Sequence, residues 1–253
     1  MLPTPSTSHV NYDRVYEPAE DSYLLLDTLS STTEAAFLQA RFPANSSSPL
    51  VLEVGTGSGV VLAFITAHAD HIIGRSDVAT IGVDMNHFAC MATKKTVRLA
   101  IKEASLTRSK PGMFADCFLG DLTTAMRPTS VDCLIFNPPY VPSERLPSVP
   151  ADDLEETAKD EFMRDSQLLF LSTDGGEDGM ETTNRLLSEL EFILSNRGVA
   201  YILLCAQNKP GEVIAQIRDW PGRWSAEKVG SSGKKAGWER LCVIRISRSR
   251  GQS

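Results

Sequence analysis

The chain has 253 residues, of which 42% are hydrophobic and 23% charged, and its formal net charge is −7. This balance is typical of one soluble globular domain, and it argues against a membrane protein, because no stretch approaches the roughly 18 uncharged apolar residues that a membrane span needs. An acidic chain also lacks the overall attraction that dominates binding to a phosphate backbone, so direct nucleic-acid binding is not expected.

The predicted elements alternate between helices and strands. In chain order we expect a helix at 17–29, a polar linker at 43–49, a strand at 50–55, a helix at 59–69, a strand at 80–85, a helix from the N-cap Asn86 to about 104, strands at 113–121 and 131–137, a helix at 181–195 closed by 196–198, a strand at 199–206, a helix at 212–219 and a final hairpin. Near-continuous apolar strands between helices predict an α/β fold with a mostly parallel sheet and a closing antiparallel hairpin.

The ends of the chain differ in composition from its middle. We expect a flexible N-terminal arm at 1–15, one folded domain at 16–247 and a basic tail at 248–253. The N-terminus lacks the basic start and apolar core of a secretory signal, which favours a cytoplasmic or nuclear location. The acidic segment 144–166 is open to two interpretations, a loop over a site or a disordered insertion.

The spacing of the cysteines does not indicate disulfide bonds. They are scattered, odd in number and form no Cys-x-x-Cys pair, so buried free thiols are favoured over disulfides or a zinc site. The histidines have no ligand spacing either, and we expect no metal ligands in this chain.

A glycine loop follows the strand at 50–55. It reads Glu53-Val-Gly55-Thr-Gly57-Ser-Gly59, and Val60 stands where the third glycine of a dinucleotide fingerprint would be. Glycines let a ligand approach the backbone closely, and the acidic Glu53 suits a ligand with a cationic amino group rather than a pyrophosphate. The alternative is a purely structural turn.

Two further acids end the next two strands. Asp84 ends the second strand, where its carboxylate can accept ribose hydroxyl protons, and Asp121 ends the third, where it can bind an adenine amino group. The backbone of Leu122 would then meet the ring edge. Carboxyl ends of successive parallel strands lie along one crevice, where such sheets bind ligands, although each acid alone is also typical of a solvated loop or cap.

The tetrad Asn137-Pro138-Pro139-Tyr140 ends the fourth strand. Two prolines remove backbone donors and stiffen the loop, so the Asn137 side-chain oxygen and the Pro138 carbonyl can accept both hydrogens of one NH2 group. Tyr140 can stack on the flat group that carries this nitrogen. Such a nitrogen is a poor nucleophile, and orientation by preorganised acceptors favours transfer of a methyl group to it. A rigid turn with a structural tyrosine is the alternative.

With these motifs in place, the sequence resembles the class I methyltransferases of the HemK type. The string at 15–22, Val-Tyr-Glu-Pro-Ala-Glu-Asp-Ser, is similar to the eukaryotic branch that methylates the class I translation termination factor. The resemblance extends from about residue 12 to 246 and includes 235–241, which resembles the family's closing hairpin. It implies a seven-stranded Rossmann-like fold, S-adenosyl-L-methionine as the cofactor, and the glutamine of a Gly-Gly-Gln loop as the methylated residue.

The resemblance also implies which residues form the site. It implies that Asn137 binds the target amide, and the reasoning on the tetrad adds Pro138 and Tyr140 as expected catalytic residues. The implied cofactor contacts are Tyr16, Glu20, Ser22, Glu53, Gly55, Gly57, Gly59, Asp84, Asp121, Leu122 and Asn137.

The same branch works with a small zinc-binding activator subunit, so the resemblance implies a heterodimer whose zinc belongs to the partner. Three other functions stay open at this point. One is adenine N6-methylation of nucleic acid, because an adenine amino group is also flat with two hydrogens. The others are methylation of protein lysine and a non-catalytic scaffold.

Overall fold

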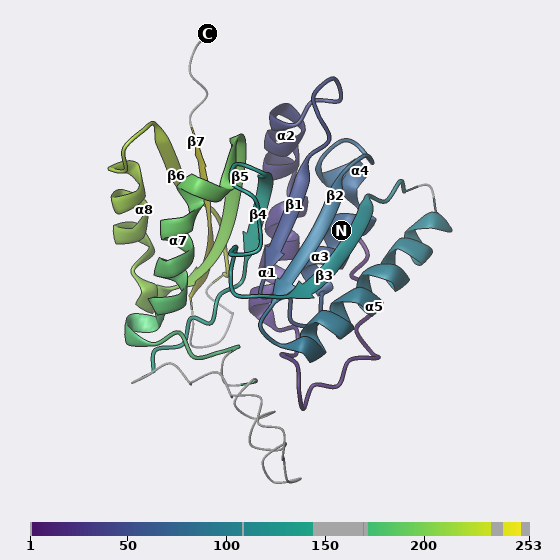
Figure 1. Cartoon of the computed structure of the whole chain (residues 1–253), viewed down its shortest axis with the longest axis horizontal. Coiled ribbons are helices and arrows are strands. Elements are labelled where there is room, and N and C mark those ends of the chain that lie inside the picture. Colours follow the sequence, from purple (N-terminus) through teal and green to yellow (C-terminus); the bar gives the residue numbers. More distant parts are fainter. Residues whose placement is uncertain (1, 108, 144–168, 170–171, 234–239, 249–253) are drawn as a thin grey trace.

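A seven-stranded sheet forms the centre of the computed structural model, which describes residues 2–107, 109–143, 169, 172–233 and 240–248 (Figure 1). The strand order is β3-β2-β1-β4-β5-β7-β6. The strands are β1 (Leu50–Val54), β2 (Ala79–Asp84), β3 (Met113–Leu119), β4 (Val131–Phe136), β5 (Leu194–Cys205), β6 (Trp224–Ser231) and β7 (Leu241–Arg248). Strands β1 to β5 pair in parallel, and β7 is antiparallel to β5 and β6, which confirms the predicted fold class.

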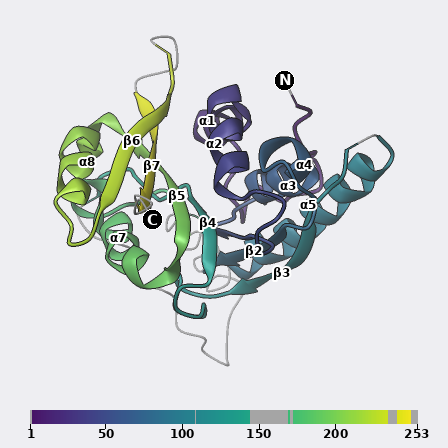
Figure 2. The same cartoon turned by 90° about the horizontal axis from the view of Figure 1, so that it is seen from above.

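Helices cover both faces of this sheet. They are α1 (Glu20–Ser30), α2 (Thr32–Arg41), α3 (Val60–Ala67), α4 (Ala69–Ile72), α5 (His87–Ser105), α7 (Glu181–Ile193) and α8 (Pro210–Arg218), with short 3₁₀ turns at Glu177–Gly179 and Ala206–Asn208. Figure 2 shows α7 and α8 on one face and α1 to α5 on the other. Because strand side chains alternate between faces, Val51 and Cys133 join the core under α1 to α5, whereas Leu52 and Leu134 join the core under α7 and α8. Among the described helices, none is long and apolar enough to span a bilayer.

Two features of the fold differ from the sequence prediction. Helix α2 was not predicted, although Ser31 caps it by accepting a hydrogen bond from the Glu34 backbone N–H at 3.3 Å. The prediction that 196–198 closes the α7 helix was wrong, because α7 ends at Ile193 and these residues lie inside β5. Leu194 already pairs with Val131 of β4, so the strand begins before the glycine at which the helix was predicted to end.

The segment before α1 lies against α5. Val10 and Val15 form a small buried cluster with Ala89, and the Asn86 side chain donates a hydrogen bond to the Arg14 carbonyl at 2.7 Å. Asn86 also caps α5, as predicted, by accepting from the Phe88 backbone N–H at 2.9 Å. The arm therefore passes beside the glycine loop, and the boundaries at 15 and 247 stay a prediction.

All five cysteines are buried with free thiols, as expected. The predicted acidic segment 144–166, residues 235–239 of the hairpin motif and the tail after 248 lie outside the described residues.

Gly59 provides a test of how α3 packs on α5. It has φ of 78°, and a Cβ there would lie 2.6 Å from the Thr93 Cα. We expect Gly59→Ala to lower the free energy of unfolding by about 3 kcal/mol in urea denaturation, because it adds both backbone strain and overpacking. Gly211→Ala is the matched control, because a Cβ there meets nothing within 4 Å. Equal unfolding midpoints for the two variants would contradict this packing.

Candidate active site

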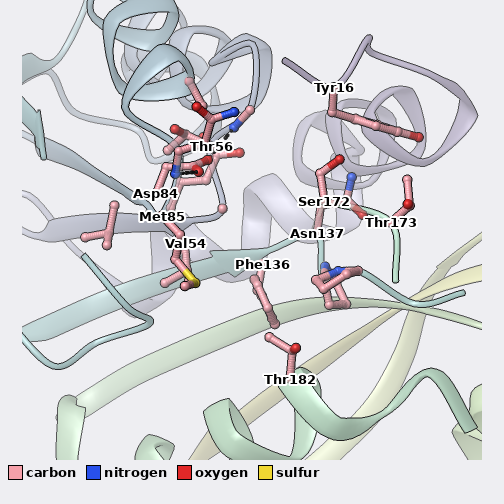
Figure 3. Close-up of a pocket in the computed structure, with 18 of the residues that line it drawn as sticks. Tyr16, Val54, Thr56, Asp84, Met85, Phe136, Asn137, Ser172, Thr173 and Thr182 are labelled. Atoms are coloured by element: carbon pink, nitrogen blue, oxygen red, sulfur yellow. Dashed lines mark hydrogen bonds between the residues drawn. The ribbon is translucent and has the colours of Figure 1, made fainter. Parts of the chain in front are cut away.

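A cavity of about 310 Å³ opens where β1 meets β4. The strand order reverses at this point of the parallel sheet, and open α/β sheets bind ligands in the crevice that results. Figure 3 shows Val54 and Asp84 on one side of the cavity and Asn137, Ser172 and Thr173 on the other.

The glycine loop forms one wall of the cavity. Gly55 and Gly57 line it with φ of 66° and 52°, both in the left-handed region that favours glycine. The Gly55 N–H donates to the Val83 carbonyl at 2.8 Å, and the Gly57 N–H donates to Asp84 Oδ2 at 2.9 Å. The loop is thus attached to the end of β2, and its backbone forms part of the cavity surface.

Glu53 is a buried carboxylate in the cavity wall. Its Oε2 accepts a hydrogen bond from the Leu62 backbone N–H at 2.8 Å, which attaches β1 to α3. Burial raises the pKa of Glu53 well above its usual range, and the nearby Asp84 raises it further. A cationic group bound beside Glu53 would lower this pKa again, because each charge would stabilise the other.

Asp84 stands at the end of β2. Its Oδ1 accepts from the Asn86 backbone N–H at 2.8 Å, while its Oδ2 accepts from Gly57. Burial raises the pKa of Asp84, and these backbone N–H groups act in the opposite direction. Each carboxylate oxygen has a further lone pair, so hydroxyl groups of a ligand can still bind here.

The third predicted acid, Asp121, is not among the residues that line the cavity. Its Oδ2 pairs with Arg185 at 2.5 Å, and its Oδ1 is buried without a hydrogen-bond partner. Its neighbour Leu122 does line the cavity and has φ of 49°, which is uncommon for a residue with a branched side chain. Arg185 is the one positively charged side chain among the described residues of the cavity wall, and Asp121 already neutralises it.

The tetrad forms the wall opposite Asp84. Asn137, Pro138 and Tyr140 all line the cavity. The Asn208 side chain holds this wall, because its Nδ2 donates to the carbonyls of Tyr140, Asp178 and Gly179 at 3.3, 3.0 and 3.3 Å, and its Oδ1 accepts from the Cys205 N–H. The tetrad is therefore built into the segment that precedes α7.

Asp21 lies beside the tetrad, although the sequence alone did not predict it as a site residue. Its Oδ2 accepts hydrogen bonds from Asn137 Nδ2 and from the Tyr16 hydroxyl, each at 3.0 Å. The position of Asp21 in the sequence does not distinguish a site residue from a structural one, because acids in the first turn of a helix commonly interact with the helix dipole. Ser172, Thr173, Thr182 and Arg185 also line the cavity, and no sequence motif marked them.

The structure brings most of the predicted site residues together. Those in the cavity wall are Tyr16, Ser22, Glu53, Gly55, Gly57, Asp84, Leu122, Asn137, Pro138 and Tyr140. Glu20 is exposed, Gly59 packs against Thr93 behind the loop, and Asp121 lies next to the wall. Within the described ranges, no three His, Cys, Asp or Glu side chains gather as metal ligands would.

Comparison with known proteins adds an independent finding. The chain is 32% identical to the eRF1 methyltransferase catalytic subunit mtq2 of Schizosaccharomyces pombe, over 98% of this chain and 96% of that protein. It is 30% identical to methyltransferase HEMK2 of Mus musculus over 98% of each, and 30% identical to a putative protein N5-glutamine methyltransferase of Methanocaldococcus jannaschii over 92% and 91%.

No family model matches the chain. Among solved structures, an ATP-dependent type ISP restriction-modification enzyme bound to DNA superposes with a TM-score of 0.53 at 10% identity, over 93% of this chain and 19% of that one. This likeness concerns the fold alone.

Proposed function

We infer the reaction from the family, because this chain belongs to the HemK-type glutamine methyltransferases that include mtq2 and HEMK2. It methylates the side-chain amide nitrogen of a glutamine in a class I translation termination factor, and S-adenosyl-L-methionine is the methyl donor. The similarity to these two relatives spans 98% of this chain and 96% and 98% of theirs.

The cavity wall fits this cofactor. Glu53 would hold its cationic amino group, and Asp84 would accept hydrogen bonds from its ribose hydroxyls. A phosphate-bearing cofactor would instead meet two carboxylates, and the one cation of the described wall, Arg185, is already paired. When bound, S-adenosyl-L-methionine supplies an electrophilic methyl group.

The single observation that best supports this reaction is the unsatisfied side-chain oxygen of Asn137. Its Oδ1 is buried without a hydrogen-bond partner in the described part of the chain, although the residue lines the cavity. A buried carbonyl oxygen without a donor costs about 1–3 kcal/mol, and a substrate N–H removes this cost on binding.

Asn137 and its neighbours can therefore orient a glutamine amide. Asn137 Oδ1 accepts one amide hydrogen, the Pro138 carbonyl accepts the other, and the Tyr140 ring stacks on the amide plane. An amide lone pair is delocalised, so the gain in rate comes from alignment of the nitrogen and from fixed acceptors rather than from a strong base.

Asn137→Ala tests this function. We expect cofactor affinity to be retained within about threefold and kcat to fall by at least about 100-fold, because the variant removes an acceptor used in the transition state. Calorimetry measures the affinity, and methyl transfer to a recombinant termination factor measures kcat, with the modified residue mapped by mass spectrometry. Asn184→Ala, at an exposed position of α7, is the matched control.

Three outcomes would contradict this function. The first is a methyl group mapped to lysine. The second is activity that disappears after nuclease treatment, which would favour an adenine substrate. The third is the absence of cofactor binding by the wild-type chain, with or without a partner, which would favour a scaffold.

Cofactor affinity is expected to depend on pH through Glu53. Burial raises the Glu53 pKa, so at low pH the carboxyl is neutral and cannot pair with an ammonium. The dissociation constant should therefore fall as the pH rises from acid values toward about pH 7.5, a range in which the cofactor amino group stays protonated. Titrations of Glu53→Gln should give weaker binding with a smaller pH dependence, the remainder of which comes from Asp84. An unchanged pH profile in this variant would rule Glu53 out as the partner of the amino group.

We propose that the zinc-binding activator subunit binds at the free edge of β3. This strand ends the sheet in the described structure, and it packs against α5. Met113 and Leu119 of β3 and Met91 of α5 are exposed by 65%, 61% and 66%. An unpaired strand edge with exposed apolar side chains is a template for pairing with another chain.

Leu119→Glu tests this interface. We expect it to abolish co-purification with the activator subunit, because it places a charge in an apolar contact beside a strand edge. Phe192→Glu is the control, since Phe192 is exposed by 62% on α7, which covers the opposite face. Zinc content of the purified complex gives a second measurement. Retention of the partner by Leu119→Glu would place the interface elsewhere.

A further inference from the structure

Asp21 is the most buried acid beside the tetrad that the proposed reaction leaves without a role. It lies in the first turn of α1 and is 2% exposed. Its Oδ2 accepts from Asn137 Nδ2 and from the Tyr16 hydroxyl, both at 3.0 Å. Its Oδ1 accepts from the Ser22 backbone N–H at 2.5 Å and from the Ser22 hydroxyl at 3.2 Å. Donors from the arm, the helix and the tetrad thus converge on one carboxylate.

These contacts determine which way the Asn137 amide is turned. An ionised carboxylate only accepts hydrogen bonds, so the group that faces it must be the NH2 of Asn137. Rotation of the amide by 180° would place two acceptors against each other in a buried site, and an unmade bond there is costly. The amide oxygen therefore points away from Asp21, and it is the atom left without a partner.

We propose that Asp21 is a positioning residue that fixes the Asn137 amide with its oxygen toward the substrate. This inference rests on the proposed function, because a glutamine NH2 group needs an acceptor at this place. With the amide reversed, an NH2 group would face the substrate NH2 group, and two donors cannot bond to each other. Asp21 lines the cavity, and in this proposal it acts through Asn137.

A purely structural role is the competing explanation. Acids in the first turn of a helix interact favourably with its dipole, and Asp21 also binds Ser22 in that turn. The two explanations differ in what restores activity. A dipole effect depends on the charge at position 21 alone, whereas positioning depends on complementarity between positions 21 and 137.

Asp21→Asn is the first test. The new side chain keeps the shape, but only one of its two ends accepts hydrogen bonds. The amide oxygen of the new side chain stays with the Ser22 N–H, and its NH2 group therefore faces Asn137. Since two NH2 groups cannot bond to each other, the Asn137 amide turns around. We expect kcat to fall by at least about 100-fold, with the cofactor dissociation constant changed less than about threefold. Asp27→Asn, at an exposed position of the same helix, should leave both unchanged.

The double variant Asp21→Asn with Asn137→Asp is the decisive test. Asn137→Asp alone places two carboxylates against each other and should also be inactive. In the double variant the new carboxylate accepts from the new NH2 group and presents its second oxygen to the substrate. We expect kcat at least about tenfold above that of either single variant.

Each outcome of these assays has a definite meaning. Wild-type kcat in Asp21→Asn, or a double variant no better than the single variants, would overturn the positioning role. If Asp21→Asn fails to bind the cofactor, the comparison of the double variant with Asn137→Asp still decides between positioning and structure.

A readout without catalysis separates this inference from the proposed function. In ¹⁵N-labelled protein, the side-chain NH2 resonances of Asn137, identified by their loss in Asn137→Ala, should exchange slowly with solvent in the wild type and rapidly in Asp21→Asn. If the wild-type chain does not methylate glutamine but this protection is present, the proposed function fails and the Asp21 contact stands. If the protection is equal in both proteins, the inference fails whatever the substrate.

Discussion

The parallel pairing of β1 with β2 on one side and β4 on the other is the constraint on which the site depends. Val54 lies opposite Val83 and Phe136 at the same level of the sheet. The chain therefore leaves all three strands together, and Gly55, Asp84 and Asn137 come to one edge although they are far apart in the sequence. The apolar strands provide the rigid base, and the polar residues that follow them provide the chemistry.

The polar groups at this edge are held mainly by backbone N–H groups. Glu53 binds the N–H of Leu62, and Asp84 binds those of Gly57 and Asn86. These bonds orient each carboxylate without neutralising it, and burial keeps the pKa of both acids raised. Because a raised pKa favours the neutral acid, a cationic ligand that binds beside Glu53 stabilises its ionised form, which agrees with the methyl donor of the family.

The sequence predicted the parts of this structure that depend on local patterns. Apolar runs located the strands, and the order of motifs located the cavity. Helix α2 was missed because its capping signal at Ser31 and Glu34 follows α1 without a loop. Asp21 was missed for another reason, since its contact with Asn137 joins residues 116 apart in the sequence. Asp121 was selected by its place after a strand, but its pairing with Arg185 is a tertiary contact that no local pattern contains.

The Asn208 side chain has a mechanical consequence for the cavity. By bonding to the carbonyls of Tyr140, Asp178 and Gly179, it makes the tetrad and the turn before α7 a single stiff unit joined to the end of β5. A glutamine that binds beside Tyr140 therefore meets a rigid wall of the cavity. The N-terminal arm is joined to the same unit, because the Tyr16 hydroxyl donates to Asp21, which also accepts a hydrogen bond from Asn137. The wall that receives the substrate amide is thus attached to β5, to α1 and to the arm at once, so a substitution in any of these three elements can displace it.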